Sequence, residues 1–309
     1  MHSSKEPHQG FPRFVSAGEA LTDFIRTGTD TWISRAGGAD WNVARVVATL
    51  GIPSAFAGAV STDRFGDELA KLSQESGLDS RFLQRIGKAP LIAMVHETSP
   101  PRYFFVGSDS ADLAFQPSLL PDGWLAHAEW LHFGCISLAR EPLSGKLLRM
   151  LDSAKAAGRK ISFDPNYRNI MTEAFDSTLR HVAERADVIK VSDEDLRGLF
   201  RTADVAEGFS RLRELNPSAP ILLTRGAEGA EMHVASNILR QAPPPIEVVD
   251  TVGAGDASVG GLLYSLMTWP DADWKAHLKF AVATGTAACL QSGAVPPCLP
   301  AVTGLLKAM

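Results

Sequence analysis

The feature that most constrains the fold of this 309-residue chain is a regular alternation of short apolar runs with longer segments of helical periodicity. Such alternation predicts βαβ units, and therefore an α/β fold whose central, mostly parallel sheet is flanked by helices. Asp40 is the expected N-cap of one helix, and Gly51 its C-terminal stop. The predicted strands cover 14–17, 54–60, 130–133, 160–163, 188–191, 221–224 and 246–249, and the predicted helices cover 40–50, 67–76, 143–157, 175–186, 193–200, 257–267 and 274–290.

Two segments break this alternation, because each contains a predicted strand that no predicted helix separates from the strand before it. The first covers roughly 27–36 and contains Thr31, Trp32 and Ile33, which suit an exposed strand. The second covers roughly 84–107, where Ser99, Pro100 and Pro101 separate two apolar runs. These segments predict a small β-sheet beside the main one.

Composition excludes several classes of protein. The net charge is −5 and no cluster of Lys or Arg stands out, so we expect no nucleic-acid partner. No apolar run reaches the about 18 residues of a membrane-spanning helix, so we expect no membrane partner. Residues 1–12 are polar and lack the apolar core of a signal peptide, which predicts a disordered tail, one domain over 13–309 and a cytoplasmic location.

The most informative motif is IEVVDTVGAGDASVGGLL at 246–263. A β-branched run ends at Asp250, and Gly253, Ala254 and Gly255 form a turn before a helix of small residues. Free amides and the positive end of the helix dipole make such a turn a site for anions. Glycine at 253 and 255 permits unusual backbone dihedrals there.

Asp256 directly follows this turn, although a carboxylate beside an anion site should repel a phosphate. Its position makes sense if it takes a proton from an attacking hydroxyl while the amides hold the phosphoryl group in transfer. One alternative is an ordinary acidic residue in the first turn of a helix. A dinucleotide-binding loop is disfavoured, since GxGxxG would need glycine at Ala257 or Ser258. A non-catalytic ligand sensor is a further alternative, against which Asp256 argues.

These residues carry a family resemblance. DTVGAGD at 250–256 resembles the C-terminal signature of the ribokinase-like (PfkB) carbohydrate kinases. GEALTDFI at 18–25 and GGADWNVA at 37–44 are similar to the family's sugar-binding segments, and TRGAEG at 224–229 to its nucleotide loop. HFGCISLA at 132–139 and SFDPNYR at 162–168 resemble its fructokinase branch. The resemblance implies a ribokinase-like fold and an ATP-dependent sugar kinase, with 27–36 and 84–107 as a lid over the sugar.

The resemblance also implies roles for individual residues. Gly253, Ala254, Gly255 and Asp256 match the catalytic motif, and Arg168 matches a position near the phosphates. Phe104 and Trp41 each have two interpretations, contact with the sugar or a place in the core. The residues implied in sugar binding are Asp23, Gly37, Gly38, Asn42, Phe104 and Asn166, and those implied in ATP binding are Ser192, Thr224, Gly226, Gly229, Thr251 and Gly255.

Cofactors and partners follow from the same resemblance. ATP and Mg²⁺ are expected, with K⁺ as an activating ion to be tested. Ser192 and Asp195 align with the family's NxxE motif but differ from it, so Asp195, or Glu194 beside it, would organise Mg²⁺ through water. Fructose is the leading substrate, and the alternatives are 2-keto-3-deoxygluconate, ribose or a nucleoside. An apolar lid face predicts a homodimer through lid contacts.

Overall fold

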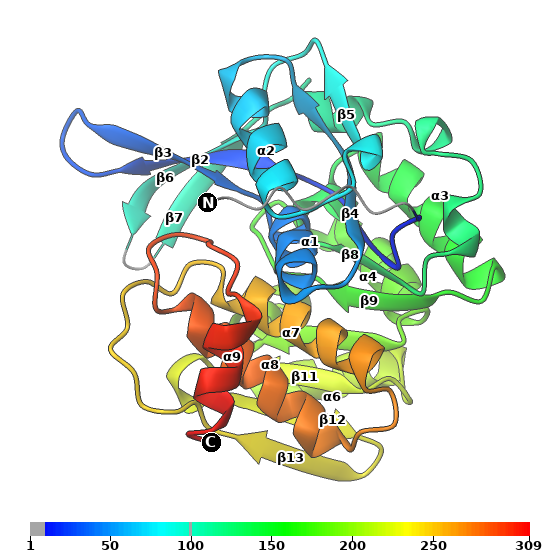
Figure 1. Cartoon of the computed structure of the whole chain (residues 1–309), viewed down its shortest axis with the longest axis vertical. Helices are drawn as coiled ribbons and strands as arrows, with labels where there is room; N and C mark the ends of the chain where they lie inside the picture. The colour runs from blue at the N-terminus through cyan, green and yellow to red at the C-terminus, as the bar shows by residue number, and fades with distance from the viewer. Residues whose placement is uncertain (1–9, 99–100) are drawn as a thin grey trace.

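A computed structural model describes residues 10–98 and 101–309 of the chain (Figure 1). The main sheet is built from β1 (Phe14–Ala17), β4 (Ser54–Ser61), β5 (Leu83–Ile86), β8 (Trp130–Gly134), β9 (Lys160–Asp164), β10 (Val188–Ser192), β11 (Ile221–Thr224), β12 (Ala230–Val234) and β13 (Asn237–Gln241). Their spatial order is β13–β12–β11–β10–β9–β8–β1–β4–β5. The strands from β11 to β5 run parallel, and β12 and β13 are antiparallel at one edge. The predicted α/β fold with a mostly parallel sheet is confirmed.

Helices cover both faces of this sheet. They are α1 (Ala39–Leu50), α2 (Arg64–Glu75), α3 (Leu143–Ala156), α4 (Asp176–Ala183), α5 (Asp193–Phe200), α6 (Val205–Leu215), α7 (Ala254–Thr268), α8 (Trp274–Ala288) and α9 (Leu299–Leu306). Alternate strand residues point to opposite faces. Leu222 therefore packs in one core cluster with α1, α7 and α8, whereas Ile221 and Leu223 pack in another with α3, α4, α5 and α6. This two-sided burial explains why the strands are apolar throughout.

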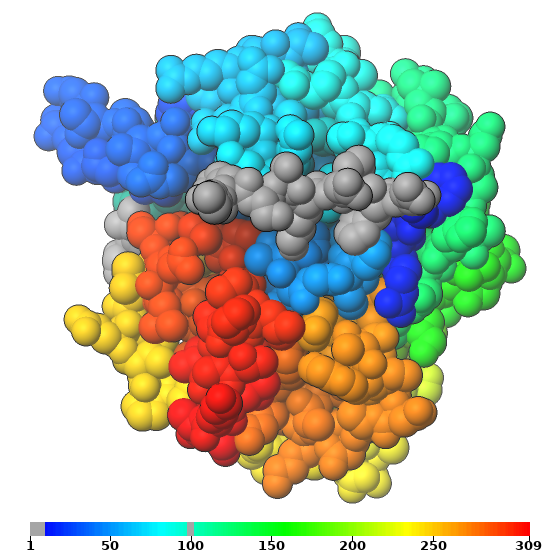
Figure 2. All heavy atoms as spheres, viewed as in Figure 1, coloured from blue at the N-terminus to red at the C-terminus, as the bar shows by residue number. Residues whose placement is uncertain are grey.

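A separate four-stranded sheet has the order β3–β2–β6–β7, with strands β2 (Leu21–Arg26), β3 (Trp32–Gly37), β6 (Ile92–Thr98) and β7 (Pro101–Val106). Its β2–β3 hairpin, in blue, projects from the body of the molecule in Figure 2. The small sheet is confirmed, but its predicted limits need correction. Leu83–Ile86 pairs with β4 in the main sheet, and Leu21–Arg26 adds a strand before 27–36.

The predicted strand at 246–249 is wrong. This segment is irregular, and the neighbouring chain instead forms the β12–β13 hairpin. Pro243, Pro244 and Pro245 lack the N–H groups that a sheet requires. Val248 and Val249 are 56% and 61% exposed, so neither is buried in a core.

The N-cap and the C-terminal end of α1 differ in how well they match the prediction. Gly51 ends α1 in the left-handed conformation, at φ 116°, as predicted. Asp40 is not the N-cap, because Gly38 occupies that position at φ 114° and the Asp40 side chain is fully buried in the first turn. Of the predicted tail at 1–12, residues 1–9 lie outside the described residues, and Phe11 packs its ring against His127.

Candidate active site

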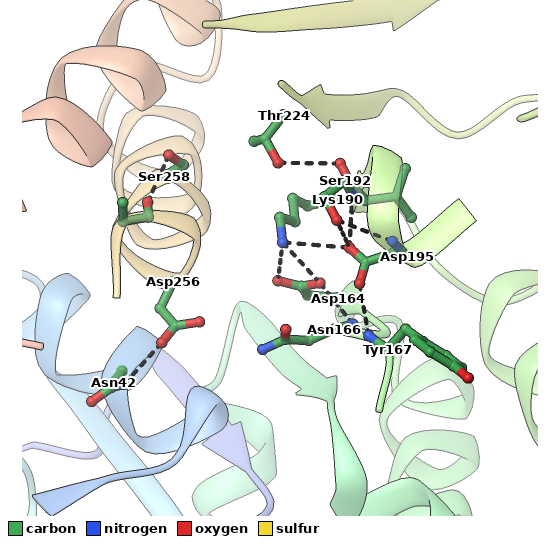
Figure 3. Close-up of polar contacts among 12 residues, drawn as sticks. Asn42, Asp164, Asn166, Tyr167, Lys190, Ser192, Asp195, Thr224, Asp256 and Ser258 are labelled. Atoms are coloured by element: carbon green, nitrogen blue, oxygen red, sulfur yellow. Dashed lines mark hydrogen bonds and ion pairs between the residues drawn. The ribbon is translucent and has the colours of Figure 1, made fainter. Parts of the chain in front are cut away.

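The predicted site residues converge where neighbouring parallel strands end. β9 ends at Asp164, β10 at Ser192 and β11 at Thr224. The first turn of α7 faces these strand ends, so Asp256 lies across from Asp164 and Lys190 (Figure 3). In open α/β sheets, ligands bind beyond the carboxyl ends of the strands. The geometry thus brings the predicted anion bend and the predicted sugar loop to the expected edge.

The bend at 253–255 has the predicted unusual backbone at Gly253 but not at Gly255, which lies within the first turn of α7. Gly253 is the N-cap of α7 and adopts the left-handed conformation, with φ 79° and ψ 0°. The amide of Ala254 donates to the carbonyl of Thr251 over 3.2 Å, which closes the turn. The first N–H groups of a helix lack intrahelical acceptors and lie at the positive end of its dipole. The bend can therefore hold an anion.

Close helix packing brings α7 to this position. A Cβ on Gly260 would lie 2.5 Å from Cγ1 of Val46 on α1, and a Cβ on Gly261 would lie 2.3 Å from Oγ1 of Thr284 on α8. Only glycine permits both approaches without displacing a neighbour. Small residues in α7 thus bring its first turn against α1, which carries Asn42.

Asp256 is buried and engaged by one neutral donor. The residue is 9% exposed, and its Oδ2 accepts a 2.8 Å hydrogen bond from Nδ2 of Asn42. Burial raises the pKa of Asp256 to about 7, and the negative charge of Asp164 also raises it, whereas Asn42, Lys190 and Arg168 lower it. A carboxylate with a pKa near neutrality is matched to general base catalysis.

A buried ion network faces Asp256. The Lys190 ammonium lies 3.0 Å from Oδ2 of Asp164 and 3.7 Å from Oδ2 of Asp195. Burial opposes the charged form of Lys190, but Asp164, Asp195 and Asp256 outweigh it and raise its pKa above the ordinary value. Burial raises the pKa of Asp164 to about 6, although Lys190 lowers it. The network therefore retains both signs of charge near the bend.

The loop after β9 holds a second cation. Arg168 donates from Nη1 to the carbonyl and Oδ1 of Asn166, over 2.9 and 2.6 Å, and to the carbonyl of Tyr167 over 2.8 Å. Asn166 adopts φ 42°, a conformation that asparagine tolerates better than most residues. The Arg168 guanidinium lies 5.6 Å from the ring centre of Tyr103 on β7. This contact joins the small sheet to the main domain at the site.

The predicted sugar-binding residues Asp23, Gly37 and Gly38 lie together at the root of the small sheet. A Cβ on Gly37 would lie 2.4 Å from Oδ2 of Asp23, and one on Gly38 would lie 2.7 Å from the carbonyl oxygen of Glu19. The glycine pair therefore permits close approach of protein groups to one another. Burial raises the pKa of Asp23 to about 6, while the positive charge of Arg168 lowers it. The positive charge of Arg168 thus lowers the pKa of Asp23 as it lowers that of Asp256.

The predicted nucleotide residues lie at the ends of β10 and β11, in the loop after β11 and in the segment 251–255. Thr224 ends β11 and donates from Oγ1 to the carbonyl of Val191 over 3.4 Å. Gly226 and Gly229 have φ values of 54° and 93°, which glycine adopts readily. Thr251 is exposed beside the bend. These positions lie near the same strand ends.

Asp195 and Glu194, predicted to organise Mg²⁺ through water, have different surroundings in the structure. Oδ1 of Asp195 accepts from the amide of Tyr167 over 2.7 Å, and Oδ2 accepts from the amide and hydroxyl of Ser192 over 2.7 and 2.8 Å. Asp195 and Ser192 thus form a capping box for α5. Glu194 is exposed and outside this box. Within 10–98 and 101–309, no group of three or more His, Cys, Asp or Glu residues is arranged to hold a metal ion.

The exposure of two aromatic residues bears on their predicted place in the core. Trp41 is fully buried and donates from Nε1 to Oγ of Ser73 over 2.8 Å, so it belongs to the core. Phe104 is 53% exposed on β7, so it is not a core residue of the small sheet. Sequence reasoning missed Lys190, whose signal was a charged residue inside the apolar run VIKVS.

Comparisons with known proteins agree with this geometry. Residues 13–302 match the pfkB family carbohydrate kinase. A fructokinase of Vibrio alginolyticus is 32% identical over 302 residues, which cover 94% of this chain and 96% of that protein. The crystal structure of a fructokinase with bound ATP from Xylella fastidiosa superposes with a TM-score of 0.86 at 28% identity, covering 96% of this chain and 98% of that one.

Two structures of the fructokinase from Vibrio cholerae O395 also match, each with a TM-score of 0.82, 28% identity and 96% coverage of this chain. The chain covers 99% of the first, a form with bound fructose, ADP and calcium, and 100% of the second, a double mutant with fructose, ADP and potassium. In the part of the chain that the structure describes, no helix has the length and apolar character to cross a membrane. The family match confirms the predicted resemblance and makes the protein a sugar kinase, a phosphotransferase with a hydroxyl acceptor. The chain belongs to the pfkB family of carbohydrate kinases.

Proposed function

We propose that this protein is an ATP-dependent fructokinase that uses Asp256 as the base for a fructose hydroxyl. The observation that carries the proposal is the buried Asp256 carboxylate at the anion bend, with a pKa raised by burial to about 7. The carboxylate takes the hydroxyl proton as the oxygen attacks the γ-phosphorus of ATP. The amides of the bend stabilise the charge on the phosphoryl group, and ADP departs.

The fructose assignment rests on the relatives named above. They are fructokinases, and this chain matches them over most of their length. Asp23, Gly37, Gly38, Asn42 and Asn166 would line the sugar, with the exposed Phe104 of β7 over it. The small sheet acts as a lid that excludes water, because water competes with the sugar for the phosphoryl group. Arg168 neutralises charge on the transferred group.

ATP would lie along the strand ends near Ser192, Thr224, Gly226, Gly229, Thr251 and Gly255. Mg²⁺ would enter with ATP and neutralise phosphate charge, while water molecules supply most of its ligands. Glu194 is the better candidate to reach those waters, since both oxygens of Asp195 already accept protein hydrogen bonds. K⁺ is proposed as an activating ion, in line with the potassium-bound relative.

The small sheet also supports a homodimer in the proposal. Trp32 and Ile33 of β3 are 37% and 38% exposed, and Val106 of β7 is 49% exposed. Covering these apolar side chains in a second copy would remove them from water. Sedimentation at two protein concentrations tests this, and a monomer at both would contradict it. A cytoplasmic location completes the proposal.

The decisive experiment compares Asp256→Asn with the parent protein in an assay for ADP release with fructose. Loss of the base predicts a fall in kcat of about 10²- to 10⁴-fold. Asp273→Asn is the matched control, because Asp273 caps the neighbouring helix α8 and is remote from the bend. An Asp256→Asn variant with parental kcat would refute the assignment of the base.

One observation favours a second substrate, 2-keto-3-deoxygluconate. That compound carries a carboxylate, and the Arg168–Tyr103 contact provides a cation and a phenol together at the lid. Comparing kcat/KM for fructose, 2-keto-3-deoxygluconate, ribose and adenosine separates the candidates. A preference for 2-keto-3-deoxygluconate that disappears in Arg168→Met would replace fructose as the substrate.

A further inference from the structure

Lys190 is a buried ammonium in a strand whose other members are aliphatic or small. Its side chain belongs to β10 and is about as buried as its apolar neighbours, with only 6% of the residue exposed. Burying an ammonium is costly unless other groups compensate its charge. The position therefore calls for an explanation beyond packing.

Two carboxylates hold the ammonium in place. Nζ of Lys190 donates to Asp164, with 3.3 Å to Oδ1 and 3.0 Å to Oδ2. Asp195 lies 3.7 Å away, which is an ion-pair distance but too long for a good hydrogen bond. An ammonium has three N–H donors. The contacts with the described residues thus leave at least one donor for a further acceptor.

The ammonium also lies against the anion bend. A Cβ placed on Gly255 would be 3.4 Å from Nζ and 3.9 Å from Cε of Lys190. Glycine at 255 therefore leaves space between the bend and the ammonium. Figure 3 shows the Lys190 side chain extending from β10 toward Asp164, in the region that Asp256 faces from α7.

The charges around Asp256 make Lys190 more than a partner for Asp164. Asp256 is faced by Asn42 from α1, Asp164 from β9, Arg168 from the following loop and Lys190 from β10, and its charge also acts on Asp40. The Arg168 guanidinium already donates to two carbonyls of its own loop. Lys190 and Arg168 are the two cations among the groups that face Asp256. If Lys190 were removed, Arg168 would be the cation left to balance Asp256 and Asp164.

We propose that Lys190 is a positioning residue of the phosphoryl-transfer site: its ammonium, fixed by Asp164 and Asp195, supplies a permanent positive charge beneath the 253–255 bend. This charge attracts the phosphoryl group and favours the ionised form of Asp256. It also gives Asp195 a role other than metal binding, because this carboxylate pairs with the ammonium and caps α5. The inference rests on the proposed function, because it requires the phosphoryl group to lie at the bend.

The kinetic test uses Lys190→Met, Lys190→Arg and the double variant Lys190→Met/Asp164→Asn. We expect Lys190→Met to lower kcat/KM at pH 7 by about 100-fold, the scale of losing one electrostatic contact to a transition state. The acidic limb of its pH profile should move upward by about one pH unit, because a nearby cation no longer favours the Asp256 carboxylate. Lys190→Arg should retain part of the activity.

The double variant separates catalysis from folding. It removes the buried pair together and leaves no isolated Asp164 carboxylate, so it should fold even if Lys190→Met does not. If Lys190 serves the bend, kcat/KM of the double variant on the high-pH plateau stays at least about 10-fold below the parent. If the plateau returns to the parental value, Lys190 only neutralises Asp164 and the inference is overturned.

A binding measurement needs no sugar. Calorimetry of AMP-PNP and ADP should show that the Lys190 variants lose affinity mainly for AMP-PNP, which carries the third phosphate group. Equal losses for both nucleotides would overturn the inference. Lys146→Met is the matched control, because Lys146 on α3 also has its ammonium held by the protein, at the carbonyls of Leu113 and Phe115. Failure of the proposed function would look different: Asp256→Asn would keep its activity, whatever the Lys190 variants do.

Discussion

Asn42 donates from Nδ2 to Oδ2 of Asp256 over 2.8 Å, although 214 residues separate them in the chain. The bond links the first turns of α1 and α7, which belong to the sugar-binding and phosphate-binding segments of the proposed site. This hydrogen bond forms only if the two helices pack closely. The absence of a side chain at Gly260, which lies against Val46, permits that packing. The base and its donor are therefore positioned by the same helix contact.

The activity of the parent protein should fall below neutral pH. Burial raises the pKa of Asp256 to about 7, and a general base must be deprotonated to act. We expect log kcat/KM to decline with unit slope below about pH 7, instead of below about pH 4 as for an ordinary carboxyl. A pH–rate profile in buffers of constant ionic strength measures this. A flat profile between pH 5 and pH 8 would contradict the assigned base.

Asn42→Leu should move that limb to higher pH. The hydrogen bond from Asn42 lowers the pKa of Asp256, so its loss leaves the carboxyl more readily protonated. Hydrogen bonds to charged groups contribute about 1.5–3 kcal/mol, which predicts a fall of about 10-fold or more in kcat/KM at pH 7. Asn42→Asp would add a carboxylate and reduce activity further. Parental activity in Asn42→Leu would mean that the 2.8 Å contact has no role in the reaction.

Asp40→Asn should stabilise the protein at neutral pH. Asp40 and Glu19 are both fully buried, Ser137 donates to Glu19, and Oδ1 of Asp40 has no hydrogen-bond partner among the described residues. Burial raises the pKa of Asp40 well above its ordinary value, and the Glu19 charge adds to this.

The sign of the pH dependence follows from that shift. The folded protein holds a proton that the unfolded chain releases, so Asp40 reduces stability as the pH rises above about 4 through its folded pKa. An amide needs no ionisation, and we expect a gain on the order of 2 kcal/mol at pH 8 that shrinks toward pH 4. Thermal unfolding of Asp40→Asn and of the exposed control Asp271→Asn measures it. A gain that is equal at both pH values would exclude the ionisation of Asp40 as its cause.

Gly260→Ala should destabilise the protein and reduce activity together. The new Cβ would lie 2.5 Å from Cγ1 and 2.7 Å from Cβ of Val46. A rotamer change does not move Cβ, so α7 must shift from α1. Overpacking of this kind lowers the free energy of unfolding by about 1–3 kcal/mol. Unfolding in denaturant measures this loss.

Gly304→Ala provides the matched control, since nothing lies within 4 Å of a Cβ at this glycine of α9. There the higher helix propensity of alanine should add up to about 1 kcal/mol. The double variant Gly260→Ala/Val46→Gly removes both close atoms of Val46 and should recover part of the activity lost in Gly260→Ala. If it recovers none, the α1–α7 contact does not govern the site.

Much of the fold is local information that a sequence carries by itself. The alternation of apolar runs and helical patterns predicted β9, β10, β11 and α5 nearly to the residue, because period and turn residues express local preferences. The GAGD bend was also predictable, since glycine at 253 and 255 and an acidic residue in the first turn of the following helix are a local pattern. The run at 246–249 misled, because β-branched residues favour strands only where a neighbouring strand and a core receive them.

The charges and partners of the site were decided by tertiary structure alone. Nothing in the sequence pairs Asn42 with Asp256, Lys190 with Asp164, or Asp195 with the amide of Tyr167. These contacts join strand ends and helix starts that are far apart in the chain and meet only when the parallel sheet assembles. The pKa of Asp256 depends on burial and on charges from those separate elements, so the chemistry of the carboxyl arises from packing.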